Sequence, residues 1–139
     1  MDAKDLMIGD WVYAIDDNGE KHPCRVNDLK YDYINKLDDF CVDFYGTEYN
    51  PEWPDVAFNV EPIPLTPEIL EKNFEKKTFY GIYDDYFDLD IREYSDGLYI
   101  VTYHSCEFNI PDQTIHLSWI HELQHFMRHC GIEKEIKLP

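Results

Sequence analysis

The sequence predicts an α+β fold built mainly from short antiparallel strands. Three observations favour it: apolar and polar residues alternate over several short runs, turn residues separate those runs, and two segments carry helix start signals. The chain has 139 residues, of which 44% are hydrophobic, enough for a packed interior. This length suits two small subdomains, which we place at 1–63 and 64–139, or one integrated domain.

The first 63 residues predict a small β unit with four short strands, at 8–15, 24–29, 40–45 and 56–63. Asp16-Asp17-Asn18-Gly19 predicts a hairpin turn, because Asn-Gly tolerates positive φ. Pro23 predicts a strand start or a sheet edge, because proline cannot donate to the ladder. The polar turns and the opening Gly9-Asp10-Trp11-Val12 favour an SH3-like antiparallel barrel, a likeness of pattern that does not fix function.

The second part begins with a short helix. Thr66 is a good N-cap, Pro67 fits the first helical position, and Glu68 complements the helix dipole. Leu65 and Leu70 are spaced to form a hydrophobic staple across the helix start. We expect this helix to end between residues 73 and 77 and to serve as a structural connector.

A β-meander is predicted over residues 78–103. Apolar residues at 87, 89 and 91 alternate with polar residues at 88, 90 and 92, which indicates one buried and one wet face. Ser95-Asp96-Gly97 predicts the turn before the return strand. Residues 106–110 predict a further strand, and the alternating tail at 133–138 predicts an edge strand.

The C-terminal helix is expected between Ser118, a good N-cap, and Gly131, a good residue just past a helix end. At about 100° per residue, its apolar residues form one stripe that should cover the sheet. We expect Leu123 and Phe126 of this stripe to be buried. A second stripe, expected to face water, holds His121, His125 and His129.

Residues 121–125 read His-Glu-Leu-Gln-His, which matches the H-E-x-x-H motif of zinc proteases. In that reading His121 and His125 bind zinc and Glu122 is the general base. A catalytic zinc needs about three protein ligands, and the longer family pattern would require histidine at position 131, where this chain has Gly131. The favoured interpretation is a solvated polar face without zinc. A zinc-dependent hydrolase is the alternative.

The chain is strongly acidic, with 29 acidic and 12 basic residues and a net charge of −17. Both halves share this excess, which disfavours direct contact with nucleic acid or anionic membrane. An acidic DNA-mimic inhibitor is a second alternative. No apolar run approaches the roughly 20 residues that span a bilayer, and no export signal is present. We therefore expect a cytoplasmic protein with free thiols at Cys24, Cys41, Cys106 and Cys130.

Four aromatic residues in turn-rich sequence are candidates for a binding surface: Tyr31, Tyr33, Tyr49 and Trp53. The alternative is that they pack in the core or at its rim. The sequence contains neither a glycine-rich phosphate loop nor a G-x-S-x-G nucleophile elbow. The favoured function is therefore a non-enzymatic protein without a cofactor that binds another protein. The sequence leaves open the identity of that partner and the oligomeric state of the chain.

Three segments together resemble an uncharacterised protein family of gut bacteria of the Bacteroides group and their phages or mobile elements: residues 5–12 (DLMIGDWV), 60–73 (VEPIPLTPEILEKN) and 120–132 (IHELQHFMRHCGI). The resemblance implies no known activity, cofactor or substrate. In that family the tail segment resembles Tyr-Val-His-Gln/Glu-Leu-Gln-His/Asn, so the histidine matching His125 is not fixed. Residues 78–115 match the family least.

Overall fold

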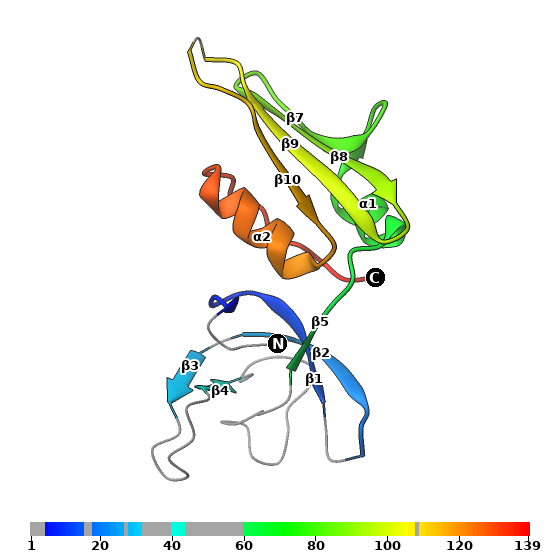
Figure 1. Cartoon of the computed structure of the whole chain (residues 1–139), viewed down its shortest axis with the longest axis vertical. Coiled ribbons are helices and arrows are strands. Elements are labelled where there is room, and N and C mark those ends of the chain that lie inside the picture. The colour runs from blue at the N-terminus through cyan, green and yellow to red at the C-terminus, as the bar shows by residue number, and fades with distance from the viewer. Residues whose placement is uncertain (1–4, 16–17, 27, 32–39, 44–59, 108) are drawn as a thin grey trace. The chain divides into compact units, whose positions relative to one another are not determined.

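A computed structural model describes residues 5–15, 18–26, 28–31, 40–43, 60–107 and 109–139, with only the backbone described at 28–31 and 40–43. The chain divides into two compact units, Met1–Ile63 and Pro64–Pro139. The described residues form two helices and antiparallel sheets, which confirms the predicted α+β class (Figure 1). Within them, neither helix has the length and apolar character needed to cross a membrane.

The first unit contains a three-stranded antiparallel sheet in the order β2-β1-β5, formed by Lys21–Arg25, Trp11–Ile15 and Val60–Pro62. A second ladder pairs β3, Asp28–Tyr31, with β4, Phe40–Asp43. Gly19 has a φ of 81° in the β1–β2 connection, as the predicted hairpin turn requires. Within the described residues these sheets do not close, so the predicted SH3-like barrel is not confirmed.

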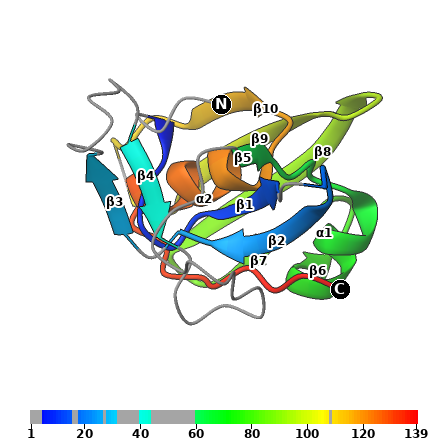
Figure 2. The ribbon, with the colours of Figure 1, turned by 90° about the horizontal axis from the view of Figure 1, so that it is seen from below.

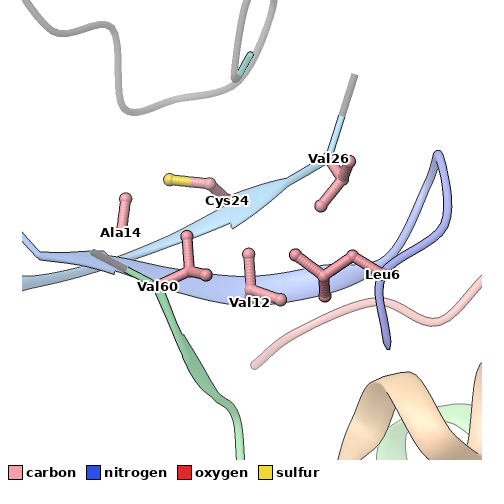
Figure 3. Close-up of a cluster of buried hydrophobic side chains, with 6 residues drawn as sticks. All are labelled: Leu6, Val12, Ala14, Cys24, Val26 and Val60. Carbon is pink, nitrogen blue, oxygen red and sulfur yellow. The ribbon is translucent and has the colours of Figure 1, made fainter. Parts of the chain in front are cut away.

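Alternation along β1 builds the core of the first unit. Val12 and Ala14 are buried, whereas the residues between and beside them are half-buried. Pro23 lies in β2 opposite Tyr13, and the edge position of β2 removes the need for a proline N–H on its outer side. Figure 3 shows the buried cluster that results, formed by Leu6, Val12, Ala14, Cys24, Val26 and Val60.

The second unit opens with α1, Pro67–Asn73, which begins and ends as the sequence predicts. The Thr66 side chain accepts a hydrogen bond from the Ile69 amide at 3.4 Å, and Pro67 occupies the first turn. Leu65 and Leu70 are both buried, as a staple across the helix start requires. The local sequence is therefore sufficient to define this helix.

A five-stranded antiparallel sheet follows, in the order β10-β9-β8-β7-β6. Its strands are β6 (Glu75–Lys76), β7 (Tyr80–Tyr83), β8 (Phe87–Ser95), β9 (Leu98–Ser105) and β10 (Gln113–Leu117). Gly97, with a φ of 75°, makes the predicted turn between β8 and β9. The strand predicted at 106–110 is wrong: the described residues there form a connection, and the strand is β10, whose alternation is too weak to mark it.

One face of this sheet is apolar, and we call it the inner face. Leu89 and Ile91 of β8 lie opposite Tyr103 and Val101 of β9, so their side chains share that face. Leu89, Ile91 and Val101 are at most 1% exposed. The helix α2, Ile120–His129, lies alongside β10 (Figure 1) and buries Ile120, Leu123, Phe126 and Met127. Burial of Leu123 and Phe126 confirms the predicted apolar stripe.

The C-terminal tail is not the edge strand that its alternation predicts, because residues 131–139 form no strand. The Asn73 side chain holds it instead. Its Oδ1 accepts a hydrogen bond from the Lys137 amide at 2.7 Å, and its Nδ2 donates to the Lys137 carbonyl at 2.7 Å. A side-chain amide thus takes the place of a neighbouring strand, and Ile136 is fully buried.

Candidate functional site

Glu122 has a structural role at the start of α2. Its Oε1 accepts hydrogen bonds from the amides of Ser118 and Trp119, both at 3.2 Å. A carboxylate at this position satisfies backbone donors that the first turn leaves free, and it complements the positive end of the helix dipole. The N-cap is Trp119 and not the predicted Ser118, whose carbonyl accepts from the Leu65 amide at 2.9 Å.

The end of α2 follows the prediction. Gly131 has a φ of 77°, the left-handed conformation in which an L side chain is strained. The Gly131 amide donates to the Arg128 carbonyl at 3.0 Å, and the Ile132 amide donates to the Met127 carbonyl at 2.8 Å. These two bonds form a Schellman motif, and both Met127 and Ile132 are buried, as its hydrophobic contact requires.

The prediction that all three histidines of α2 face water is wrong. His121 is only 7% exposed and His125 is half-buried, whereas His129 is exposed. The buried residues of the helix also include Gln124, so its buried face is wider than the apolar stripe. A helical wheel shows which residues share a face of the helix, but it does not show which neighbouring segments cover a polar position.

The geometry around His121 and His125 does not assemble a zinc site from the described residues. Their rings meet edge to face, with centroids 5.6 Å apart and planes at 79°. Within the described ranges, no group of three histidine, cysteine, aspartate or glutamate side chains is placed to hold a metal ion. The Glu122 oxygen that the zinc reading assigns to proton transfer is engaged at the helix start. Glu122 therefore has a structural role at the start of α2.

The predicted aromatic surface falls outside what the structure describes. Tyr33, Tyr49 and Trp53 lie outside the described residues, and at Tyr31, the last residue of β3, only the backbone is described. Of the expected thiols, Cys24, Cys106 and Cys130 are free cysteines, Cys24 buried and Cys106 exposed. Burial raises the pKa of Cys130, which keeps that thiol protonated at neutral pH.

A second candidate site is the face of the five-stranded sheet opposite the inner face, which we call the outer face. Strand register places its residues in three rows across β8, β9 and β10. The first row contains Arg92, Ile100 and His116, and the second contains Asp90, Thr102 and Thr114. The third row spans β8 and β9 alone and contains Asp88 and His104.

The first row forms an aromatic end of the outer face. Tyr94, placed by a β-bulge between Glu93 and Ser95, stacks on His116 with centroids 6.1 Å apart and planes at 23°. The Tyr94 side chain is nevertheless 69% exposed. The Arg92 guanidinium lies over the Phe79 ring, 5.9 Å from its centroid. A large aromatic side chain is therefore held in place while most of its surface remains in water.

The other end of the outer face is acidic. The Tyr83 hydroxyl lies 2.8 Å from Asp90 Oδ1 and 2.9 Å from the Phe79 carbonyl, two acceptors for its one proton. Burial, and next the Asp90 carboxylate, raise the pKa of Tyr83, so the phenol stays protonated. His104 Nδ1 contacts Asp112 Oδ1, and this bond to Asp112 raises the pKa of His104.

Alternation in the sequence predicts the solvent-facing side of β8, but it does not predict the aromatic end of the outer face. That end depends on a bulge at Tyr94 and on β10, and neither has a clear local signature. No protein-family model, curated protein or solved structure matches the chain.

Proposed function

We propose that this chain is a non-enzymatic, cytoplasmic protein-binding module whose outer face contacts a partner protein. The proposal rests chiefly on Tyr94, which is ordered by its stack on His116 and yet largely exposed. Tyrosine is enriched among the residues that dominate interface energies, because its ring supplies apolar area and its hydroxyl a polar contact. The resemblance of three segments to a phage and mobile-element family supports an origin of that kind.

Charge indicates the chemistry of this partner. The net charge of −17 attracts basic surfaces over distances up to about a Debye length, which is longest at low salt. On the outer face, Asp90 lies in the row next to the aromatic end, and Asp88 lies in the row beyond it. A matching partner surface presents lysine or arginine beside an apolar side chain that packs on Tyr94. The cation of Arg92 interrupts the acidic residues of β8, which does not favour an unbroken row of phosphate-like charges.

The test compares two exposed tyrosines of the same unit. The full chain captures a partner from a lysate of its native cell, and dissociation constants are then measured with that purified partner. Tyr94→Ser should weaken binding at least about tenfold, as loss of an interface anchor does. Tyr86→Ser is the matched control, because Tyr86 is 77% exposed but lies in the β7–β8 connection, and it should leave the constant unchanged.

Salt and charge give a second readout. Asp88→Asn should weaken the same complex, and raising the salt concentration should weaken it further. Equal dissociation constants for the wild type, Tyr94→Ser and Tyr86→Ser would overturn the proposal. Displacement of the partner by duplex DNA, with no effect of Tyr94→Ser, would favour the DNA-mimic alternative instead.

A further inference from the structure

The outer edge of β10 carries a separate inference, independent of Tyr94. We propose that β10 pairs antiparallel with β10 of a second copy of this chain, so that two five-stranded sheets join into one across a two-fold axis. The β10 strand is an edge of its sheet, with β9 as its neighbour on one side among the described residues (Figure 2). An edge strand presents backbone N–H and C=O groups that another strand can pair with.

The composition of β10 lacks the usual protection of an edge strand. Natural edges are commonly protected by charged residues, especially lysine, by proline or by bulges. Residues 113–117 read Gln-Thr-Ile-His-Leu, with no aspartate, glutamate, lysine or arginine, no proline and no glycine, in a chain where those four charged residue types make up 29%. Its ladder with β9 runs in unbroken register from Gln113 to Leu117. This strand is therefore regular and uncharged.

Exposed apolar side chains are concentrated around the same edge. The described residues include eight large hydrophobic side chains that are exposed, and three of them lie within residues 110–119: Ile110 at 41%, Ile115 at 37% and Trp119 at 37%. Ile115 shares the inner face with Val101, which is fully buried, so its exposure results from its place at the sheet margin. A neighbouring strand would cover it.

A two-fold axis at Ile115 gives a self-complementary register. Ile115 then lies opposite Ile115 of the second copy, Thr114 opposite His116, and Gln113 opposite Leu117. Continuing outward, Asp112 lies opposite Ser118, and Pro111 opposite Trp119. No carboxylate is directly opposite another carboxylate, although each copy carries a net charge of −17. The edge therefore offers two strongly acidic chains a contact without local like-charge pairs.

The charge of β10 also favours a second copy of this chain over a basic strand of another protein as the strand that pairs with it. The β10 strand holds no carboxylate that would bind a lysine or arginine. Repulsion between two copies acts through the remaining surface and is screened by salt, whose Debye length falls from about 10 Å at 0.1 M to about 3 Å at 1 M. Pairing of two copies should therefore strengthen as salt rises. Binding of a basic strand should weaken.

Sedimentation equilibrium of the full chain at about 0.1 M and about 1 M salt tests the proposal. The mass should rise with concentration from that of the 16.7 kDa chain toward twice that value, and at lower concentration in high salt. Thr114→Lys places an exposed lysine in the edge and should weaken dimerisation at least about tenfold, or about 1.4 kcal/mol. Thr78→Lys, an equal change of charge at an exposed site between β6 and β7, is the control and should not.

Ile115→Lys repeats the test from the inner side of the strand, and thermal melting of each variant verifies that it is folded. A monomer at every concentration in both salts would overturn the proposal. A dimer that weakens in high salt, or one that Thr114→Lys and Ile115→Lys leave intact, would also overturn it. The readout here is the mass of the chain alone, whereas the Tyr94 comparison measures binding of a partner protein, so failure of one test is distinct from failure of the other.

Discussion

The two edges of the five-stranded sheet differ in the features that decide whether a strand accepts another. The β6 edge has two residues, Glu75 and Lys76, both charged and exposed. The β10 edge has five residues and no charge. Short, charged strands are how sheets avoid pairing with other chains, and lysine is the commonest device. One sheet therefore has a short, charged edge and a longer edge without such protection.

On the protected side, Gly81 of β7 lies against the backbone of β8, and its replacement should have the largest effect. A Cβ added at Gly81 would lie 1.8 Å from the Leu89 carbonyl oxygen, a backbone atom that cannot move without shifting β8. Gly81→Ala should therefore cost more than about 4 kcal/mol of unfolding free energy, or prevent folding. The measurement is chemical denaturation followed by circular dichroism.

Gly97→Ala is the matched control for this glycine. Gly97 has open space around it but a φ of 75°, so alanine should cost only the left-handed strain of about 1–2 kcal/mol. Equal losses at the two positions would show that the β7–β8 approach is not the constraint on this side of the sheet.

On the open side, the helix that follows β10 should be held by its buried stripe. Leu123 is fully buried, so Leu123→Ala should lower the unfolding free energy by about 2–5 kcal/mol. His129→Ala, at an exposed position of the same helix, should change it by less than about 0.5 kcal/mol. Urea denaturation of both variants measures the difference. Similar values for the two would contradict the assigned face of α2.

A smaller effect should arise at the junction between β10 and α2. Glu122→Ala removes the acceptor of the Ser118 and Trp119 amides and should cost about 0.5–2 kcal/mol, as losses of helix caps do. Glu71→Ala, at an exposed position of α1, is the control. If Glu122→Ala leaves thermal stability unchanged, the capping role is wrong and the H-E-x-x-H motif requires another explanation.

The smallest effect concerns the ion pair immediately before β10. Asp112 raises the pKa of His104 above its ordinary value near 6.5, and both side chains are exposed. A pKa raised in the folded state gives stability that is present below about pH 6.5 and is lost as pH rises through the raised value. The melting difference between wild type and Asp112→Asn should therefore shrink above that range. An NMR titration should show a lower His104 pKa in Asp112→Asn, and an unchanged pKa would refute the pairing.

Local chemistry explains why parts of this fold were predictable. Thr66 with Pro67 starts α1, Gly131 ends α2, and alternation at 87–91 marks the inner face, because each signal acts within a few neighbouring residues. The burial of His121 was not predictable, because it depends on which distant segments cover the second face of the helix. The same holds for the tail, where Lys137 pairs with the side-chain amide of Asn73, 64 residues earlier in the chain, and not with a strand.

The candidate site shows the same division. The wet face of β8 followed from its aspartates, but the stack of Tyr94 on His116 joins a bulge to a strand whose sequence alternates weakly. The open character of β10 was visible in its composition only after its place at the sheet edge was known, because an uncharged five-residue run is unremarkable inside a sheet.

Amide hydrogen exchange of the wild-type chain, measured in dilute and in concentrated solution, compares the two edges most directly. Amides of β10 that are not bonded to β9 should exchange more slowly in concentrated solution, because a second copy pairs with them. Amides of β6 should exchange at the same rate in both solutions. Exchange in β10 that is independent of concentration, or slowing in β6 alone, would contradict the claim that β10 is the open edge.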